Sequence, residues 1–197
     1  MVAEFALDPD TALMLKVSAG DAPSFELLLA RHRMQVVNHL YRLVHNRDIA
    51  EELAQEVFIR IYRSRSTYQP EAKFTTWLFR ITTNIALNWR RDTRKETLHV
   101  RLDDEIRGNR RRELLDSGPR ADEMLLKEQR ASEIRAAVET LPSKQLAAVL
   151  MHKYEGMEYV EIAEALECTI PALKSLLFRA YETLRQRLAK FDPAHAA

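Results

Sequence analysis

The sequence contains few of the residues that interrupt or cross-link a chain. Its 197 residues include four glycines, seven prolines and a single cysteine, Cys168. One cysteine excludes an internal disulfide and favours a reducing compartment. Most of the glycines and prolines stand between periodic apolar segments, and no run of alternating β-branched residues is present. These absences favour an all-α protein.

Long apolar runs and a strong charge of one sign are also lacking. No apolar run is long enough to span a bilayer, and the N-terminus "MVAEFALDPD" lacks the basic and apolar regions of a signal peptide. We therefore expect a cytoplasmic protein that does not insert into a membrane. Because the formal net charge is only +1, binding to nucleic acid has to rest on local patches.

The motifs of the common enzyme classes are missing too. The six histidines do not gather at metal-ligand spacing, and no glycine-rich phosphate loop or nucleophile elbow occurs. We expect no enzyme activity, no metal and no cofactor.

Helix signals are abundant, and they divide the chain into two helical domains. Asp8-Pro9 opens a short helix that ends near Gly20, and Asp21 with Pro23 opens a longer one. Two further helices, "DIAEELAQEVFIRIY" and "FTTWLFRITTNIALNWRRDTRK", follow. In the first of these, Asp48 and Glu51 form a predicted N-terminal capping pair.

A change of composition marks the boundary between the domains. The charge-dense stretch 96–120 holds two of the four glycines and is typical of a linker that can include some helix. We expect a first domain at 1–95, a second helical domain at 121–190 and a frayed tail at 191–197. Pro142 and Gly156 bracket one helix of the second domain.

The stretch "EIAEALECTIPALKSLLFRA" reads as a helix that stops at 167–169 and resumes at once. Thr169 is a good N-cap, and Pro171 falls in the first turn, where its missing N–H matters little. A short helix, a tight turn and a second helix form the plan of a DNA-binding helix-turn-helix. The spacing alone fits a helical hairpin packed only for stability equally well. The expected outward positions of the second helix are Ala172, Lys174, Ser175, Leu176 and Arg179.

A second candidate site lies on the helix that begins near Phe74. One side of it carries cations and amides, and aromatic residues cluster near its start. Cations follow a phosphate backbone, amides read base edges and aromatics stack on an unpaired base. The alternative is a solvated basic face over an aromatic core. The residues concerned are Arg80, Thr83, Asn84, Asn88, Arg91 and Lys95, with the aromatics Tyr68, Phe74 and Trp77.

The preceding helix has the opposite charge and would repel DNA. Its acidic side therefore indicates either a protein partner with basic residues or a solvated helix surface. That side carries Asp48, Glu51, Glu52, Gln55 and Glu56.

Together these segments resemble the bacterial sigma factors of the extracytoplasmic-function group. "DIAEELAQEVFIRIY" is similar to the region-two helix that docks on the RNA polymerase clamp. "FTTWLFRITTNIALNWRR" is similar to the segment that opens and reads the minus-ten element. "LPSKQLAAVLMHKYEGMEYVEIAEALECTIPALKSLLFRAYETLRQRL" resembles region four, which reads the minus-thirty-five element. The resemblance covers most of the chain, with both blocks in the family's order.

The resemblance implies partners and roles: core RNA polymerase, promoter DNA and an anti-sigma factor. Polymerase contacts would fall at Asp48, Glu52, Gln55 and Glu56. Asn84 falls where the family contacts a flipped-out minus-ten base, in a pocket that the loop 64–73 helps to form. The residues expected at the upstream element are Thr169, Ala172, Lys174, Ser175, Phe178 and Arg179. The sequence departs from the family at Glu167, Pro171 and Leu176, where a small residue, a glycine and an arginine are usual.

Two other functions remain as alternatives. One is a stand-alone dimeric helix-turn-helix regulator whose first domain binds an effector or the second copy. The other is a sigma-mimicking protein that sequesters an anti-sigma factor without touching DNA. The basic side of the helix near Arg80 argues against this second alternative.

Overall fold

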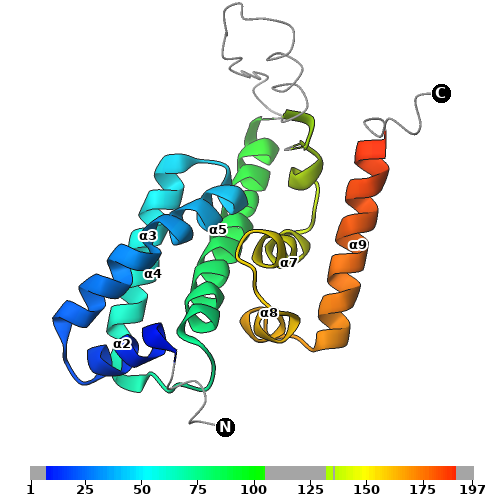
Figure 1. Cartoon of the computed structure of the whole chain (residues 1–197). Coiled ribbons are helices and arrows are strands. Elements are labelled where there is room, and N and C mark those ends of the chain that lie inside the picture. Colours follow the sequence, from blue (N-terminus) through cyan, green and yellow to red (C-terminus); the bar gives the residue numbers. More distant parts are fainter. Residues whose placement is uncertain (1–7, 105–131, 135, 190–197) are drawn as a thin grey trace, which may run out of the picture.

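The computed structural model describes residues 8–104, 132–134 and 136–189. Within these ranges every regular element is a helix, and no strand occurs. None of the helices there is long and apolar enough to cross a membrane. The prediction of an all-α fold is confirmed, and Figure 1 shows the helices as two groups packed side by side.

The first group is formed by the N-terminal half of the chain. Its predicted early start signals are confirmed, because the Asp8 carboxylate accepts a hydrogen bond from the backbone N–H of Thr11 at 2.8 Å and Pro23 lies in the first turn of the second helix. The elements are α2 (Pro9–Ser18), α3 (Ala22–Val44), α4 (Arg47–Arg63), the 3-10 turn η1 (Arg65–Thr67) and α5 (Phe74–Asp104).

The predicted capping pair of α4 is wrong. Asn46 is the N-cap, and its side chain accepts from the backbone N–H of Ile49 at 3.1 Å. Asp48 lies inside the first turn, where its charge complements the helix dipole, and Glu51 pairs with Arg47 at 3.0 Å. Asn and Asp cap helices about equally well, so the residue types alone did not fix which of the two begins the helix.

The core of the first group lies where α3, α4 and α5 meet. Leu40, Val57 and Leu78, one from each helix, are fully buried. The short helix α2 fixes the start of α5, because the Thr11 hydroxyl accepts from the backbone N–H of Phe74 at 3.1 Å. The N-terminal helix therefore sets where the loop before α5 ends.

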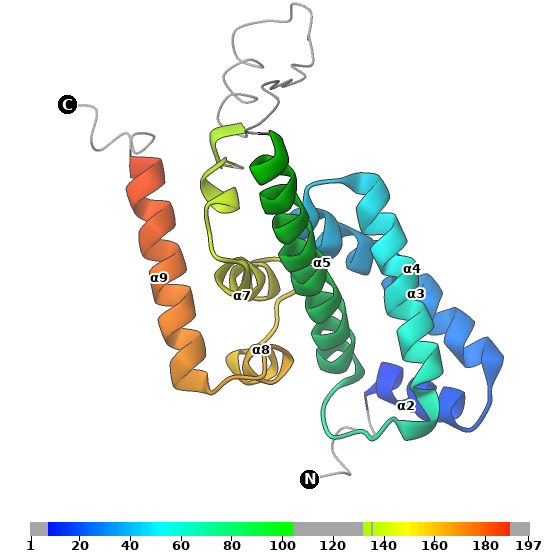
Figure 2. The ribbon, with the colours of Figure 1, turned by 180° about the vertical axis from the view of Figure 1, so that it is seen from behind.

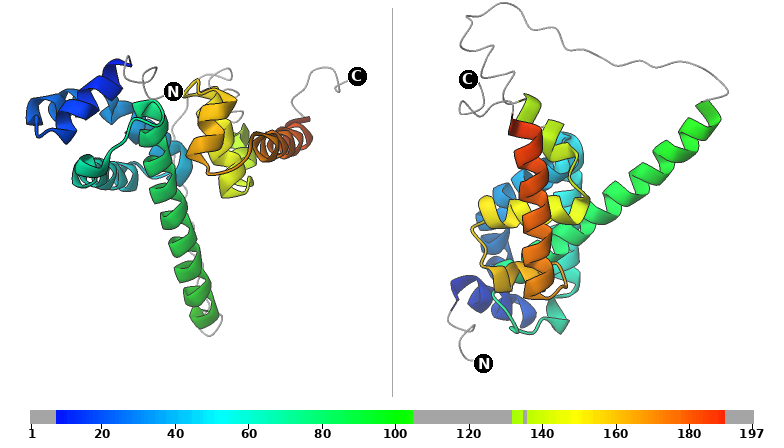
Figure 3. Two further views of the ribbon diagram at one scale, coloured as in Figure 1. Left: turned by 90° about the horizontal axis from the view of Figure 1, so that it is seen from below. Right: turned by 90° about the vertical axis from the view of Figure 1, so that its right-hand side faces the viewer.

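Helix α5 extends beyond the predicted end of the first domain. It continues past position 95 to Asp104, and Figure 3 shows its far end projecting beyond the other helices. Most of the predicted linker 96–120, the predicted start of the second domain at 121 and the tail 191–197 lie outside the described residues. These boundaries stay predictions.

The second group contains α7 (Ser143–Lys153), α8 (Tyr159–Ala165) and α9 (Ile170–Leu188). The predicted helix-turn-helix is confirmed. Glu167 takes the left-handed backbone conformation, with φ 51°, between α8 and α9. The Thr169 hydroxyl caps α9 by accepting from the backbone N–H of Ala172 at 3.3 Å. Leu166 and Leu173, on either side of the turn, are buried.

The two groups contact each other directly. Helices α7 and α8 lie between α5 and α9, and Figure 2 shows the same order from behind. Helix α9 is the outermost element of the second group, so its far side does not face the first group.

Candidate nucleic-acid interface

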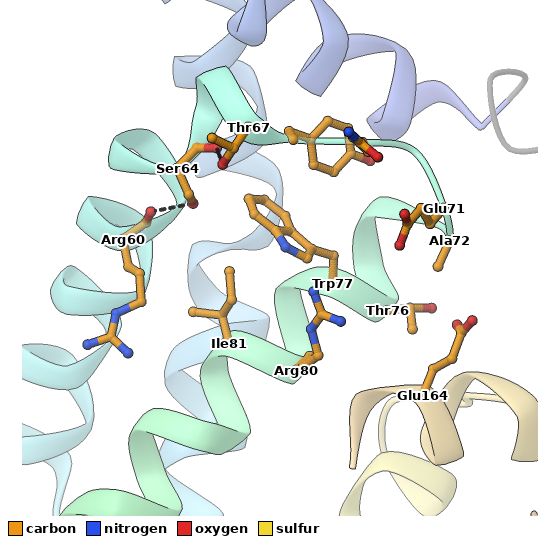
Figure 4. A pocket seen from close by; sticks show the side chains of 12 residues that line it. Arg60, Ser64, Thr67, Glu71, Ala72, Thr76, Trp77, Arg80, Ile81 and Glu164 are labelled. Carbon is orange, nitrogen blue, oxygen red and sulfur yellow. Dashed lines mark hydrogen bonds between the residues drawn. The ribbon is translucent and has the colours of Figure 1, made fainter. Parts of the chain in front are cut away.

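A pocket of about 480 Å³ opens at the start of α5 (Figure 4). Its walls come from the end of α4, the loop 64–72 and the first turns of α5, with one residue from α8. The loop and the start of α5 thus enclose a pocket, but Asn84, which the resemblance placed at the base-binding pocket, is not among the residues that line it. Residues that line it include Arg60, Tyr68, Trp77, Arg80, Ile81 and Glu164.

The three aromatic residues occupy different depths of this region. Phe74 is completely buried and packs between His32 and Trp77, with ring centroids 5.5 Å and 6.1 Å away. Tyr68 is 8% exposed, and its ring centroid lies 4.9 Å from that of Trp77. Burial raises the pKa of Tyr68. Trp77 is half-buried and lines the pocket, so it offers the aromatic surface on which a base could stack, while Phe74 supports it from the core.

Four of the predicted polar residues of α5 form an exposed row. Arg80, Asn84, Asn88 and Arg91 are all exposed, and their spacing of three or four residues places them on one side of the helix. Arg80 also lines the pocket. The row therefore runs from the pocket along α5 and combines cations with amides.

Thr83 does not belong to this exposed row. It is completely buried, and its hydroxyl oxygen lies 3.4 Å from Nε2 of His39. One residue before Asn84, it is turned by about 100° around the helix axis, which points it at α3. Its placement on the exposed side was wrong for this reason. The side chain of Lys95 lies outside the described residues.

The acidic side of α4 is accessible, as predicted. Asp48, Glu52 and Gln55 are exposed. Glu56 is partly exposed and forms an ion pair with Arg60 one turn later at 2.9 Å. An exposed i, i+4 pair of this kind contributes only a few tenths of a kcal/mol, so it leaves Glu56 free to exchange partners.

An apolar groove beside this acidic side was not predicted. It occupies about 450 Å³ between α3 and α4. Its lining is mainly apolar and also includes Gln55 and charged residues: Phe25, Leu29, Arg33, Glu51, Ala54, Gln55, Phe58, Ile59, Tyr62 and Arg63. Ile59 is 45% exposed. An exposed apolar groove next to charged residues is typical of a protein-binding surface. The sequence contained one signal of this groove: Ile59 is apolar but does not lie on the buried helical stripe of α4.

The outward side of α9 carries the predicted helix-turn-helix residues. Thr169, Ala172, Lys174, Ser175, Phe178 and Arg179 are all exposed. Phe178 is 69% exposed, an unusual position for a large apolar ring. Within the described part of the chain, neither Lys174 nor Arg179 forms an ion pair. Leu176 is half-buried at the margin of this surface.

Comparison with known proteins matches both halves of the chain to described families. The family described as Sigma-70 region 2 matches residues 28–96, and Sigma-70, region 4 matches residues 131–184. The first match covers α4 and the exposed row of α5, and the second covers the helix-turn-helix.

Characterised relatives match almost end to end. The chain is 32% identical over 184 residues to the ECF RNA polymerase sigma-E factor of Haemophilus influenzae, covering 91% of this chain and 95% of the relative. It is 28% identical over 185 residues to the RNA polymerase sigma-H factor of Pseudomonas aeruginosa, covering 92% and 94%. The sigma-E factor of Escherichia coli is also 28% identical, over 184 residues, covering 91% and 94%.

Two solved structures share the fold. CnrH in complex with the cytosolic domain of CnrY superposes with a TM-score of 0.66 at 18% identity, covering 93% of this chain and 98% of that one. The sigma factor RpoE of Bartonella quintana, in complex with the anti-sigma factor NepR, superposes with a TM-score of 0.60 at 20% identity, covering 84% and 96%.

Proposed function

We propose how this chain reads a promoter, starting from its family: it belongs to the extracytoplasmic-function sigma factors of bacterial RNA polymerase. It therefore acts with core RNA polymerase in transcription initiation, where sigma factors recognise the minus-ten and minus-thirty-five elements. The proposal assigns each exposed surface described above to one of these partners. It places the protein in the cytoplasm, where the polymerase acts, and gives it no catalytic step of its own.

The observation that carries the proposal is the pocket at the start of α5 together with the exposed row that leads from it. A volume of about 480 Å³ falls in the range of pockets that enclose small ligands, and an extruded base is a ligand of that class. Trp77 provides a stacking surface, worth about 1–3 kcal/mol per base. Arg80 is placed to neutralise the adjacent phosphate, and the Asn84 amide can bond a base edge. The minus-ten strand would then follow α5 past Asn88 and Arg91.

The upstream element is assigned to the outward side of α9. Lys174 and Arg179 are exposed cations that fit phosphate contacts. Phe178, with most of its ring exposed, fits apolar contact with the methyl group of thymine. At the base pair that Phe178 contacts, we expect a preference for A·T with the thymine facing the Phe178 ring.

Polymerase docking is assigned to α4 and the apolar groove beside it. Asp48, Glu52, Gln55 and Glu56 would contact basic residues of the partner, while the groove supplies apolar area. Interfaces commonly combine an apolar centre with a charged rim. We further propose an anti-sigma factor as a partner, because the RpoE structure with a similar fold is a complex with such a protein.

Two binding experiments separate this function from the alternatives. Co-purification of the full chain with core polymerase is expected for a sigma factor and not for a stand-alone dimeric regulator. Sequence-dependent promoter binding by that complex is expected here and not for a protein that only sequesters an anti-sigma factor. A chain that bound DNA specifically as a dimer, without polymerase, would overturn the proposal.

A further inference from the structure

The N-terminal helix α2 is tied to the pocket at the start of α5 by a buried threonine. Thr11 is completely buried. Its hydroxyl donates a hydrogen bond to the Asp8 carboxylate at 2.8 Å and accepts one from the backbone N–H of Phe74 at 3.1 Å. Asp8 also accepts from the backbone N–H of Thr11 at 2.8 Å. Because the hydroxyl proton points at Asp8, the oxygen lone pairs are left for the N–H of Phe74.

Thr11 lies where the two ends of the pocket loop come together. This loop runs from Tyr68, after η1, to Phe74, the first residue of α5. The Tyr68 hydroxyl is buried beside Thr11, and Phe74 is bonded to Thr11 through its backbone. Figure 4 shows the loop passing above Trp77 in that view. The residues between its ends that line the pocket are Gln69, Glu71 and Ala72. One side chain of α2 therefore contacts both ends of this wall.

A second contact from α2 supports the ring of the same phenylalanine. The Asp10 carboxylate lies 2.8 Å from Nε2 of His32 and also pairs with Arg31. His32 is buried, and its ring centroid lies 5.5 Å from that of Phe74. The Phe74 ring in turn lies 6.1 Å from the Trp77 ring. Helix α2 thus fixes Phe74 by its backbone and backs its ring, next to the residue proposed to stack on a base.

The pocket needs this support because one of its walls is a loop. Loops are the most mobile connections of a folded domain, whereas a binding site has to keep its contact surfaces within about 0.5 Å of the productive geometry. A buried backbone N–H without a hydrogen-bond partner is unfavourable. Without the Thr11 hydroxyl, Phe74 and the end of the loop would therefore shift until another acceptor satisfied this N–H. That shift would move the support of the Trp77 ring.

We propose that Thr11 is a positioning residue for the reading of the minus-ten strand, and that Asp8 orients it. The proposal rests on the proposed function of the pocket. Thr11 is buried and touches no DNA; it acts through Phe74 and Tyr68, which hold the loop and the stacking surface in place before the base arrives. Because the wall is already ordered, binding of the base does not have to order it, and affinity for the strand is higher.

The first test measures how far the effect of Thr11 depends on the extruded base. The holoenzyme, formed from the full chain and core polymerase, is titrated with a fluorescent single-stranded oligonucleotide that carries the minus-ten sequence of transcribed templates. An abasic nucleotide is then moved through that sequence one position at a time. The position where the parent protein loses most affinity marks the extruded base.

Thr11→Val keeps the branched shape of the side chain and removes the hydroxyl. The variant should bind the intact strand about fivefold or more weakly than the parent protein, as expected when a buried N–H loses its partner. On the strand with the abasic nucleotide at the marked position, variant and parent should bind equally. Equal losses on both strands would overturn the proposal, because general destabilisation does not depend on the base.

Three further variants separate positioning from stability. Thr11→Ser keeps the hydroxyl and should bind the intact strand like the parent protein. Asp8→Ala removes the acceptor that orients the hydroxyl, and it should weaken binding in the same base-dependent way by a smaller factor. Thr183→Val in α9 removes a hydroxyl that donates to the Arg179 carbonyl at 2.9 Å. This matched control should leave binding of both strands unchanged. A Thr11→Ser protein as weak as Thr11→Val would overturn the role of the hydroxyl.

The free protein offers a test that needs no DNA. Its two tryptophans are Trp77 and Trp89, so a Trp89→Phe background leaves Trp77 as the only one. Quenching of its fluorescence by acrylamide then reports how accessible the Trp77 ring is. Thr11→Val should raise the quenching constant relative to Thr11→Ser, while far-UV circular dichroism stays unchanged. Equal quenching in the two variants would overturn the positioning role and leave the proposed function standing. A parent holoenzyme that bound intact and abasic strands equally at every position would instead overturn the proposed base reading, and the role of Thr11 with it.

Discussion

Glu167 lies in the turn between the two helices of the helix-turn-helix. Its φ of 51° is the left-handed conformation, which disfavours non-glycine residues by about 1–2 kcal/mol. This conformation was foreseeable at Glu167, because the resemblance places a small residue at this turn and a non-glycine residue can adopt the left-handed region at a modest cost. Glycine would remove the strain but add freedom to the unfolded chain.

From this we predict effects of different size on stability for two substitutions. Glu167→Gly should change the unfolding free energy by less than about 1 kcal/mol, because relief of strain and added chain entropy offset each other. Glu167→Val should destabilise the protein by more than about 1 kcal/mol, since a β-branched residue fits the left-handed region worst. Denaturant melts followed by circular dichroism measure both. Equal melts for the two variants would contradict the left-handed turn.

We propose that the exposed amide of Asn84 reads a base of the minus-ten strand. Asn84→Ala should remove amide hydrogen bonds to a base, worth about 1–3 kcal/mol, while duplex contacts upstream survive. Permanganate footprinting should then show less strand opening at similar closed-complex occupancy. Asn38→Ala, the same change at a half-buried site on α3, is the control. Equal loss at both stages would count against a base-reading role.

Among the elements, α4 offers the clearest test of docking. Replacing Gln55 and Glu56 together by lysine should weaken binding to core polymerase, because reversed charge then faces a basic partner, commonly at several kcal/mol. The helix should persist, since both side chains are accessible. The matched control is Glu182→Lys with Gln186→Lys in α9. Unchanged affinity of the α4 variant for core would show that docking occurs elsewhere.

The exposed cations of α9 lead to a separate prediction, about how DNA affinity depends on salt concentration. Lys174→Ala and Arg179→Ala should each lower affinity for the upstream element and reduce the salt slope by about one unit per lost phosphate contact. Leu176→Arg adds a cation at the half-buried margin and should raise DNA affinity while steepening the slope. A Leu176→Arg protein that melts early without gaining affinity would instead place Leu176 in the core and this side of α9 outside the groove.

Across the whole molecule, the sequence predicted features that depend on near neighbours better than it predicted contacts between residues far apart in the chain. Caps, prolines and helical spacing predicted most helices and the exposed row on α5, because these are interactions between near neighbours. They misplaced Thr83, whose burial depends on His39 in another helix. They also missed the seating of Glu155 on α3, more than a hundred residues earlier. No local pattern marks a contact between two residues that only the folded arrangement brings together.

The most direct test of the central claim is in vitro transcription by purified core polymerase over a promoter library, with and without this protein. We predict transcripts that depend on the protein, from templates that share two sequence elements about 25 base pairs apart, or roughly 85 Å of duplex. Transcription unaffected by the protein would contradict the account. So would selection of paired half-sites one helical turn apart by the protein alone, which would indicate a dimeric regulator.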